Sequence, residues 1–257
     1  GFSEERTLRE GKGYPLSKAV FDALVPRLRA HDRGPLFAFA HLLDAHSPYN
    51  SATQTGTPFE RYLAELAVVD GQLARLIREL KHKRLWGRTT LIVYSDHGEA
   101  FGEHGSKFHG HGVYEELIRV PLIVRTPKPG RRIEAPVTLL DVGPTILDLY
   151  GLETPGSMMG LSLVPWMRDG SATPPPRPIV SEARLKRAIV FPDGSKVIHD
   201  TRHYTVEEYD LNADPGELSD RYDEGNRESV VRLSKLKRFF EVHALRRPGY
   251  KPPFRRW

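Results

Sequence analysis

The sequence predicts an α/β fold in which a mainly parallel sheet is flanked by helices and followed by a small C-terminal antiparallel subdomain. Its 257 residues, of which 39% are apolar and 28% charged, suffice for one large globular domain or a domain with a smaller subdomain. Helical and strand patterns alternate from Ser17 to Val124, which is typical of a parallel sheet. Several short strand patterns follow between Ile179 and Tyr209, which is typical of an antiparallel sheet.

The first two expected elements are a helix and a strand. Apolar residues between Ser17 and His31 recur at helical spacing and predict an amphipathic helix. The run 36–43 is almost wholly apolar, as in parallel strands covered on both faces, and predicts a buried strand. The polar segment 44–49 comes next, so His46 is expected at the carboxyl end of that strand.

The second helix has clear signals at both ends. At its start Thr57 can cap the helix, Pro58 suits the first turn and Glu60 can complete a capping box. Apolar residues then keep the helical period as far as Leu80. The basic segment 81–84 suits the negative end of the helix dipole.

Two strands and a helix are expected next. The apolar runs 89–94 and 121–124 predict two further buried strands. A short helix is expected from Pro144 to Tyr150, because Gly151 provides a stop signal directly after it.

A Pro-rich linker over 170–178 is expected to separate the later part of an α/β core, 1–169, from a C-terminal subdomain, 170–257. The last helix is expected from Glu228 to His243, ahead of a basic tail. Between linker and helix the patterns predict short strands joined by a tight turn at 192–194, at 179–182, 188–191, 196–198 and 206–209.

Composition excludes several classes of protein and site. The chain has no cysteine, which excludes disulfides, thiolate metal ligands and a thiol nucleophile within it. No apolar run approaches the ~20 residues that a membrane-spanning helix needs. The net charge is +5, but residues 232–257 hold nine Lys or Arg against Glu241 alone. This basic tail predicts a solvated surface, with contact to an anionic membrane as the alternative, and nucleic-acid binding is not expected.

The densest group of potential functional residues lies between Asp96 and Glu116. Asp96 and His97 directly follow the expected strand 89–94, and carboxyl ends of parallel strands are where open α/β sheets bind ligands. An oxygen and a nitrogen ligand side by side suit a divalent cation, whereas a solvated turn capped by Asp96 is the alternative. The same window holds His104, His109, His111, Glu99, Glu103, Lys107 and Glu115.

A second candidate is His46. A histidine titrates near neutrality and could donate a proton to a leaving group, although a purely structural role before the Pro48 turn is the alternative.

Together, four segments in order resemble the sulfatase family of the alkaline phosphatase superfamily. The first is Val-Tyr-Ser-Asp-His-Gly-Glu at 93–99, with Phe-Gly-Glu-His-Gly at 101–105 after it. The others are 113–125, 135–151 and the Glu-Tyr-Asp-Leu-Asn-Ala-Asp-Pro-Gly-Glu segment at 208–217. The resemblance runs from about Ser17 to Asp220 and implies an alkaline-phosphatase-like fold.

The resemblance also implies a hydrolase that cleaves a sulfate ester of a small molecule or glycan. Asp96 and His97 would bind one divalent ion, calcium by expectation, with manganese, zinc or magnesium as alternatives. His46 would protonate the leaving alcohol, and His109 would contact the substrate. We expect these four side chains to face one cleft, because metal ligation and proton donation must act on the same ester.

Two departures from the family pattern matter. Many sulfatases carry a lysine four residues before the family tyrosine, where this chain has Gly110, so Lys107 or His111 would have to contact the substrate instead. Nothing upstream of His46 resembles the family's nucleophile segment, so the formylglycine is expected in a missing segment and the chain alone is expected to have no turnover.

Two competing interpretations remain. One is a phosphoethanolamine or phosphoglycerol transferase, or a phosphodiesterase, of the same superfamily; the other is a noncatalytic pseudoenzyme or binding module. A single metal favours singly charged sulfate esters over phosphate monoesters, which favour two-metal sites. The resemblance also favours an extracytoplasmic location.

Overall fold

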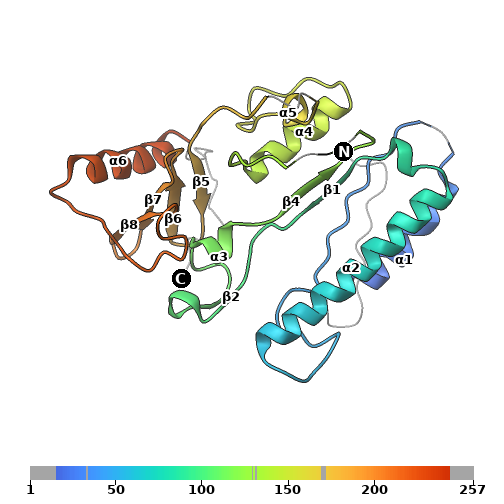
Figure 1. Ribbon diagram of the computed structural model, residues 1–257, viewed down its shortest axis with the longest axis horizontal. Coiled ribbons are helices and arrows are strands. Elements are labelled where there is room, and N and C mark those ends of the chain that lie inside the picture. The colour runs from blue at the N-terminus through green and yellow to red at the C-terminus, as the bar shows by residue number, and fades with distance from the viewer. Residues whose placement is uncertain (1–15, 33, 129, 131, 169–171, 244–257) are drawn as a thin grey trace, which may run out of the picture. The chain divides into compact units, whose positions relative to one another are not determined.

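A computed structural model describes residues 16–32, 34–128, 130, 132–168 and 172–243 (Figure 1). The described residues group into two compact units, one within 16–92 and 124–128 and the other within 93–123 and 130–243. Among the described residues, no helix is both long and apolar enough to span a membrane. The end of the basic tail, 244–257, lies outside the described residues.

The first unit is built on two helices that lie side by side, α1 (Ser17–Ala30) and α2 (Pro58–His82) (Figure 1). Both predicted helices are confirmed. The capping box of α2 is complete, since the Glu60 N–H donates to Thr57 Oγ1 and the Thr57 N–H donates to Glu60 Oε2. The helices pack through the buried side chains Phe21, Leu28, Leu76 and Leu80, each of which stabilises the fold by about 1.5–3 kcal/mol.

The prediction of a buried strand at 36–43 is wrong. This run belongs to none of the sheets found in the described residues, and Leu36, Phe37 and Phe39 are 45%, 43% and 60% exposed. An apolar run marks residues that favour burial, but a strand also requires a neighbouring strand for its backbone hydrogen bonds. His46 therefore follows a segment without regular secondary structure rather than the end of a strand.

The strands β1 (Leu91–Tyr94) and β4 (Leu122–Arg125) form a two-stranded sheet. Both predicted strands are present, but they are half-buried rather than buried, with Tyr94 38% and Ile123 60% exposed. Within the described residues each strand has a single partner strand, so much of its surface stays accessible.

In the second unit, the predicted antiparallel sheet is confirmed. Its strands pair in the order β5-β6-β7-β8, every pair antiparallel. The predicted tight turn joins β6 to β7, where Gly194 has a φ of +85° and its N–H donates to the Phe191 carbonyl. The strands are β5 (Ile179–Glu182), β6 (Lys186–Val190), β7 (Ser195–Asp200) and β8 (Val206–Asp210).

Both faces of this C-terminal sheet are covered. The helix α6 (Arg227–Val242) lies along one face, where Leu236 packs on Ile189 and Val197 (Figure 1). Ile198, on the opposite face, packs with Val113, which precedes the short helix α3 (Glu115–Ile118). Because successive strand residues point to opposite faces, all six residues of β7 are buried.

The remaining helices of the second unit follow β4 in the sequence. The 3₁₀ turn η3 (Leu139–Asp141) leads into α4 (Val142–Leu149), and α5 (Val164–Arg168) comes after a loop. The predicted helix with a glycine stop is confirmed, since Gly151 has a φ of +68°. Asp141 is fully buried and forms an ion pair with Arg177, which anchors the Pro-rich segment to this helical region.

Candidate active site

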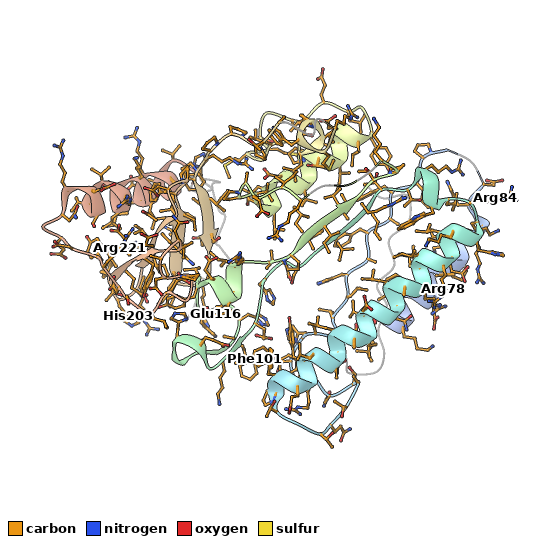
Figure 2. All side chains as sticks on the ribbon, viewed as in Figure 1. Arg78, Arg84, Phe101, Glu116, His203 and Arg221 are labelled. Atoms are coloured by element: carbon orange, nitrogen blue, oxygen red, sulfur yellow. The ribbon has the colours of Figure 1, made fainter. Side chains whose placement is uncertain are left out.

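The window between Asp96 and Glu116 folds as a loop with short regular elements. β2 (Ala100–Phe101) and β3 (Lys107–Phe108) pair antiparallel around the 3₁₀ turn η2 (Glu103–Gly105), and α3 closes the window. Figure 2 shows Phe101 in the loop and Glu116 on α3. We name residues 96–118 the site loop.

Three of the predicted site residues lie together in this loop. His97 Nε2 lies 3.8 Å from Asp96 Oδ1, and the His97 backbone N–H donates to the same oxygen at 3.2 Å. The ring of His109 stacks on the ring of His97, with centroids 3.8 Å apart and planes inclined by 23°. The loop therefore gathers a carboxylate and two imidazoles, of which Asp96 is the most exposed, at 66% of its side chain.

The donor set at Asp96 and His97 fits part of a divalent metal site. His97 Nδ1 lies 2.8 Å from the Gly98 carbonyl, an acceptor, so this nitrogen carries the proton and Nε2 keeps its lone pair. Metal-binding histidines usually donate their second ring N–H in this way. Within the described residues, no group of three or more His, Cys, Asp or Glu is arranged to hold a metal ion, so this pair could supply two ligands only.

His109 is oriented by a buried carboxylate. Its Nδ1 lies 3.0 Å from Glu99 Oε1, and the Glu99 side chain is only 4% exposed. The sequence places Glu99 in the histidine cluster, but no sequence pattern assigns it this role. Lys107 on β3 and His111 after it are exposed, and their part in substrate contact stays a prediction.

His46 lies in the first unit, in a turn whose start is anchored to α1. The Asp44 carboxylate, 2% exposed, accepts hydrogen bonds from the Ser17 backbone N–H at 2.7 Å and from Ser17 Oγ at 2.6 Å. The His46 ring is half-buried, and its Nδ1 lies 2.8 Å from the Ser47 carbonyl. The convergence of His46 with Asp96 and His97 stays a prediction.

A network of buried polar groups connects the site loop to the C-terminal sheet. His104 stacks on Tyr114 at 3.8 Å, and its two ring nitrogens lie 2.9 Å from Glu116 Oε1 and 3.1 Å from the Glu217 carbonyl. Burial opposes the charged imidazolium, but these hydrogen bonds and the two carboxylates outweigh it and raise the pKa of His104.

The same network continues on strand β8. Tyr114 and Tyr209 both donate their hydroxyl hydrogens to Glu207, at 2.6 and 2.8 Å, and Lys186 lies 3.2 Å from the other Glu207 oxygen. Burial acts to raise the pKa of Glu207, but these hydrogen bonds and the lysine charge outweigh it and lower that pKa. Burial raises the pKa of both tyrosines, and the Glu207 carboxylate raises it further. The tyrosines therefore act as hydrogen-bond donors rather than bases.

Comparison with known proteins identifies the family. The family model named Sulfatase matches residues 3–152, which include Asp96, His97 and His109. The chain belongs to the sulfatase family of the alkaline phosphatase superfamily. Its solved sulfatase neighbours have the alkaline-phosphatase-like fold expected for this sulfatase chain, whereas the mainly parallel sheet stays a prediction.

Particular sulfatases match over much of this chain. An N-acetylglucosamine-6-O-sulfatase of Bacteroides thetaiotaomicron is 31% identical over 200 residues, which cover 70% of this chain and 34% of the relative. Arylsulfatase K of Xenopus laevis is 37% identical over 112 residues, or 43% of this chain and 21% of the relative. The structure of BT4656 in complex with its substrate D-glucosamine-2-N,6-O-disulfate has 29% identity and a TM-score of 0.60, covering 72% of this chain and 40% of that one. The sulfatase chain thus spans about a fifth to a third of the length of these curated relatives.

The raised pKa of His104 predicts a pH dependence of stability in the sulfatase chain. A histidine with a raised folded-state pKa stabilises the fold fully below its unfolded-state pKa of about 6.5, and this contribution is lost as the pH rises through the folded-state value. We expect the difference in unfolding free energy between the unmodified chain and His104→Gln to be larger at acidic than at alkaline pH. Urea unfolding at a series of pH values measures it, and a difference that grows with pH would contradict the prediction.

Proposed function

We propose that the chain supplies the metal-binding part of the active site and the general acid of a divalent-metal-dependent sulfuric ester hydrolase. The observation that supports this most is that the family match includes the site loop, in which Asp96, His97 and His109 lie together. As in the family, we expect these residues at the edge of a mainly parallel sheet.

Each predicted residue has a proposed role. Asp96 and His97 would hold one divalent ion, with calcium favoured over manganese, zinc or magnesium, and the bound ion would neutralise charge on the sulfate oxygens. His109, held by Glu99 through Nδ1, would contact the substrate with the other side of its ring. Lys107 and His111 are exposed, so they would act on a substrate group that projects into solvent.

His46 would act as the general acid. Its Nδ1 lies 2.8 Å from the Ser47 carbonyl, and in the acid form of the ring Nε2 would carry the proton that is transferred. Transfer of that proton to the leaving oxygen would avoid the formation of an alkoxide, which is a poor leaving group. The nucleophile, a formylglycine by resemblance, would come from the part of the longer relatives that this chain does not match.

The proposed substrate is a sulfate ester of a glycan or small molecule. One relative is an N-acetylglucosamine-6-O-sulfatase, and the solved complex holds D-glucosamine-2-N,6-O-disulfate as its substrate. A sulfated amino sugar is therefore the first compound to test.

The test compares three esters on the protein that contains this chain together with the proposed nucleophile segment. We expect turnover of an aryl sulfate with one divalent ion bound, and slower turnover of the matching aryl phosphate and phosphodiester. Asp96→Asn with His97→Gln should remove both ion binding and turnover. Faster turnover of either phosphorus ester would favour the transferase or phosphodiesterase interpretation, and turnover of none would favour the pseudoenzyme.

A further inference from the structure

Lys196 is a fully buried lysine that lies on β7, on the face of the C-terminal sheet that packs against the site loop. Its Nζ lies 3.0 Å from Glu115 Oε1 and 2.8 Å from Glu217 Oε1. A buried ammonium is tolerated only where carboxylates lie close enough to offset the loss of hydration. The two acidic partners come from different segments, so Lys196 ties the sheet, α3 and the loop at Glu217 together.

Glu217 also fixes the start of α3. Its second carboxylate oxygen accepts a hydrogen bond from the Glu115 backbone N–H at 2.6 Å. That N–H is one of the first donors of the helix, which have no partner within the helix itself. The side chains of Lys196 and Glu217 together therefore determine where α3 begins and how far it stands from the sheet.

α3 in turn is in direct contact with the backbone of Gly98, the residue after His97. The Gly98 N–H donates to the Leu117 carbonyl at 2.8 Å. A β-carbon added to Gly98 would lie 2.0 Å from the Glu116 carbonyl oxygen, so the two backbones touch where glycine stands. The Gly98 carbonyl is the acceptor that fixes the protonated nitrogen of His97, at 2.8 Å.

We propose that Lys196 and Glu217 are positioning residues for His97, acting through α3 and Gly98. The contacts described above connect Lys196 and Glu217 to His97 only through α3 and Gly98. The two residues therefore affect the position and the tautomer of the His97 imidazole indirectly. The inference rests on the proposed function for the role of His97, but the geometry that it concerns can be measured without any turnover.

The experiment uses the full 257-residue chain with ¹⁵N-labelled histidine and backbone amides. In Lys196→Met we expect the ring nitrogens of His97 to lose the signature of a single tautomer, and the Gly98 amide to exchange at least tenfold faster with solvent. The matched control is Lys235→Met on α6, where the lysine lies 5.6 Å from the Phe191 ring centroid. The control should leave both signals unchanged.

A second variant separates positioning from folding. Lys196→Met alone leaves the carboxylates of Glu115 and Glu217 without their lysine. Adding Glu217→Gln removes one of these two charges and keeps an oxygen that accepts the hydrogen bond from the Glu115 N–H. The double variant should therefore fold even if the single variant does not. We expect the His97 signals to be perturbed in this variant too, while amide exchange at Ile189 in β6 and Leu236 in α6, which report the folding of the same unit, stays as in the unmodified chain.

The two proposals fail in different ways. Unchanged His97 and Gly98 signals in the folded double variant would overturn the positioning role, whatever the enzyme hydrolyses. Absence of sulfate ester turnover, combined with His97 signals that do depend on Lys196, would overturn the proposed function and leave the positioning role standing.

Discussion

Replacing His46 by alanine is expected to slow the hydrolysis of an unactivated sulfate ester by roughly 10²- to 10⁴-fold in the protein that carries the nucleophile segment. The reason is that a sugar alcohol leaves slowly unless a proton reaches its oxygen during bond cleavage. With a nitrophenyl sulfate, whose leaving group is stable as an anion, the same variant should lose far less. Steady-state kinetics on both esters measure the ratio.

A matched control is His41→Ala, because His41 is an exposed histidine in the same unit. It should leave kcat unchanged for both esters. An equal loss of rate with the two leaving groups in His46→Ala would show that His46 does not protonate the leaving oxygen. An unchanged rate of His46→Ala with the sugar sulfate would likewise show that His46 is not the proton donor.

The second large effect is expected for Gly98→Ala. The new methyl group would lie 2.0 Å from the Glu116 carbonyl oxygen and 3.2 Å from the Leu117 α-carbon, and both of these are backbone atoms. Because backbone cannot rotate away as a side chain can, α3 must separate from Gly98. We expect a loss of about 3 kcal/mol or more in unfolding free energy, at the upper end of overpacking effects. Urea unfolding followed by tryptophan fluorescence and circular dichroism measures this loss.

Gly71→Ala provides a control with the opposite sign. Gly71 lies inside α2, and a β-carbon there would meet no atom within 4 Å. Alanine favours the helix over glycine by about 1 kcal/mol, so this variant should be more stable than the unmodified chain. A stability loss of similar size in both variants would mean that the close approach at Gly98 is not what limits substitution there.

The helices could be predicted from the sequence because their signals are local. The apolar period and the Thr57–Glu60 capping box specify α2 within a few residues of its observed ends. The strands of the C-terminal sheet are likewise close to their predicted ranges. Their signals, the alternation of apolar and polar residues and the turn at Gly194, also lie within a short stretch of sequence. The prediction of a strand at 36–43 was wrong because a strand forms only beside a neighbouring strand, and an apolar pattern does not show whether one is present.

The candidate site also has one part that local sequence predicts and another that depends on the fold. Asp96 and His97 are adjacent in the sequence, so their proximity needs no knowledge of the fold. The stacking of His109 on His97 and its bond to Glu99 depend on how the loop turns back through β2 and β3. Lys196 gave no signal at all, because a lysine in a short strand pattern is ordinarily expected on the surface. Its burial follows from partners supplied by two distant segments.

The covering of both faces of β7 has a consequence for the order of events during synthesis. Lys196 follows Glu115 by 81 residues in the sequence, and Glu217 follows Glu115 by 102 residues. Glu217 follows its other partner, His104, by 113 residues. At a ribosomal rate of roughly 5–20 residues per second, Glu217 is added about 5–20 s after Glu115. During that interval, Glu115 on the nascent chain lacks Glu217, and for most of it Glu115 also lacks Lys196. Completion of the site loop is therefore delayed until translation has passed β8, and the loop is then ordered by long-range contacts, which form slowly.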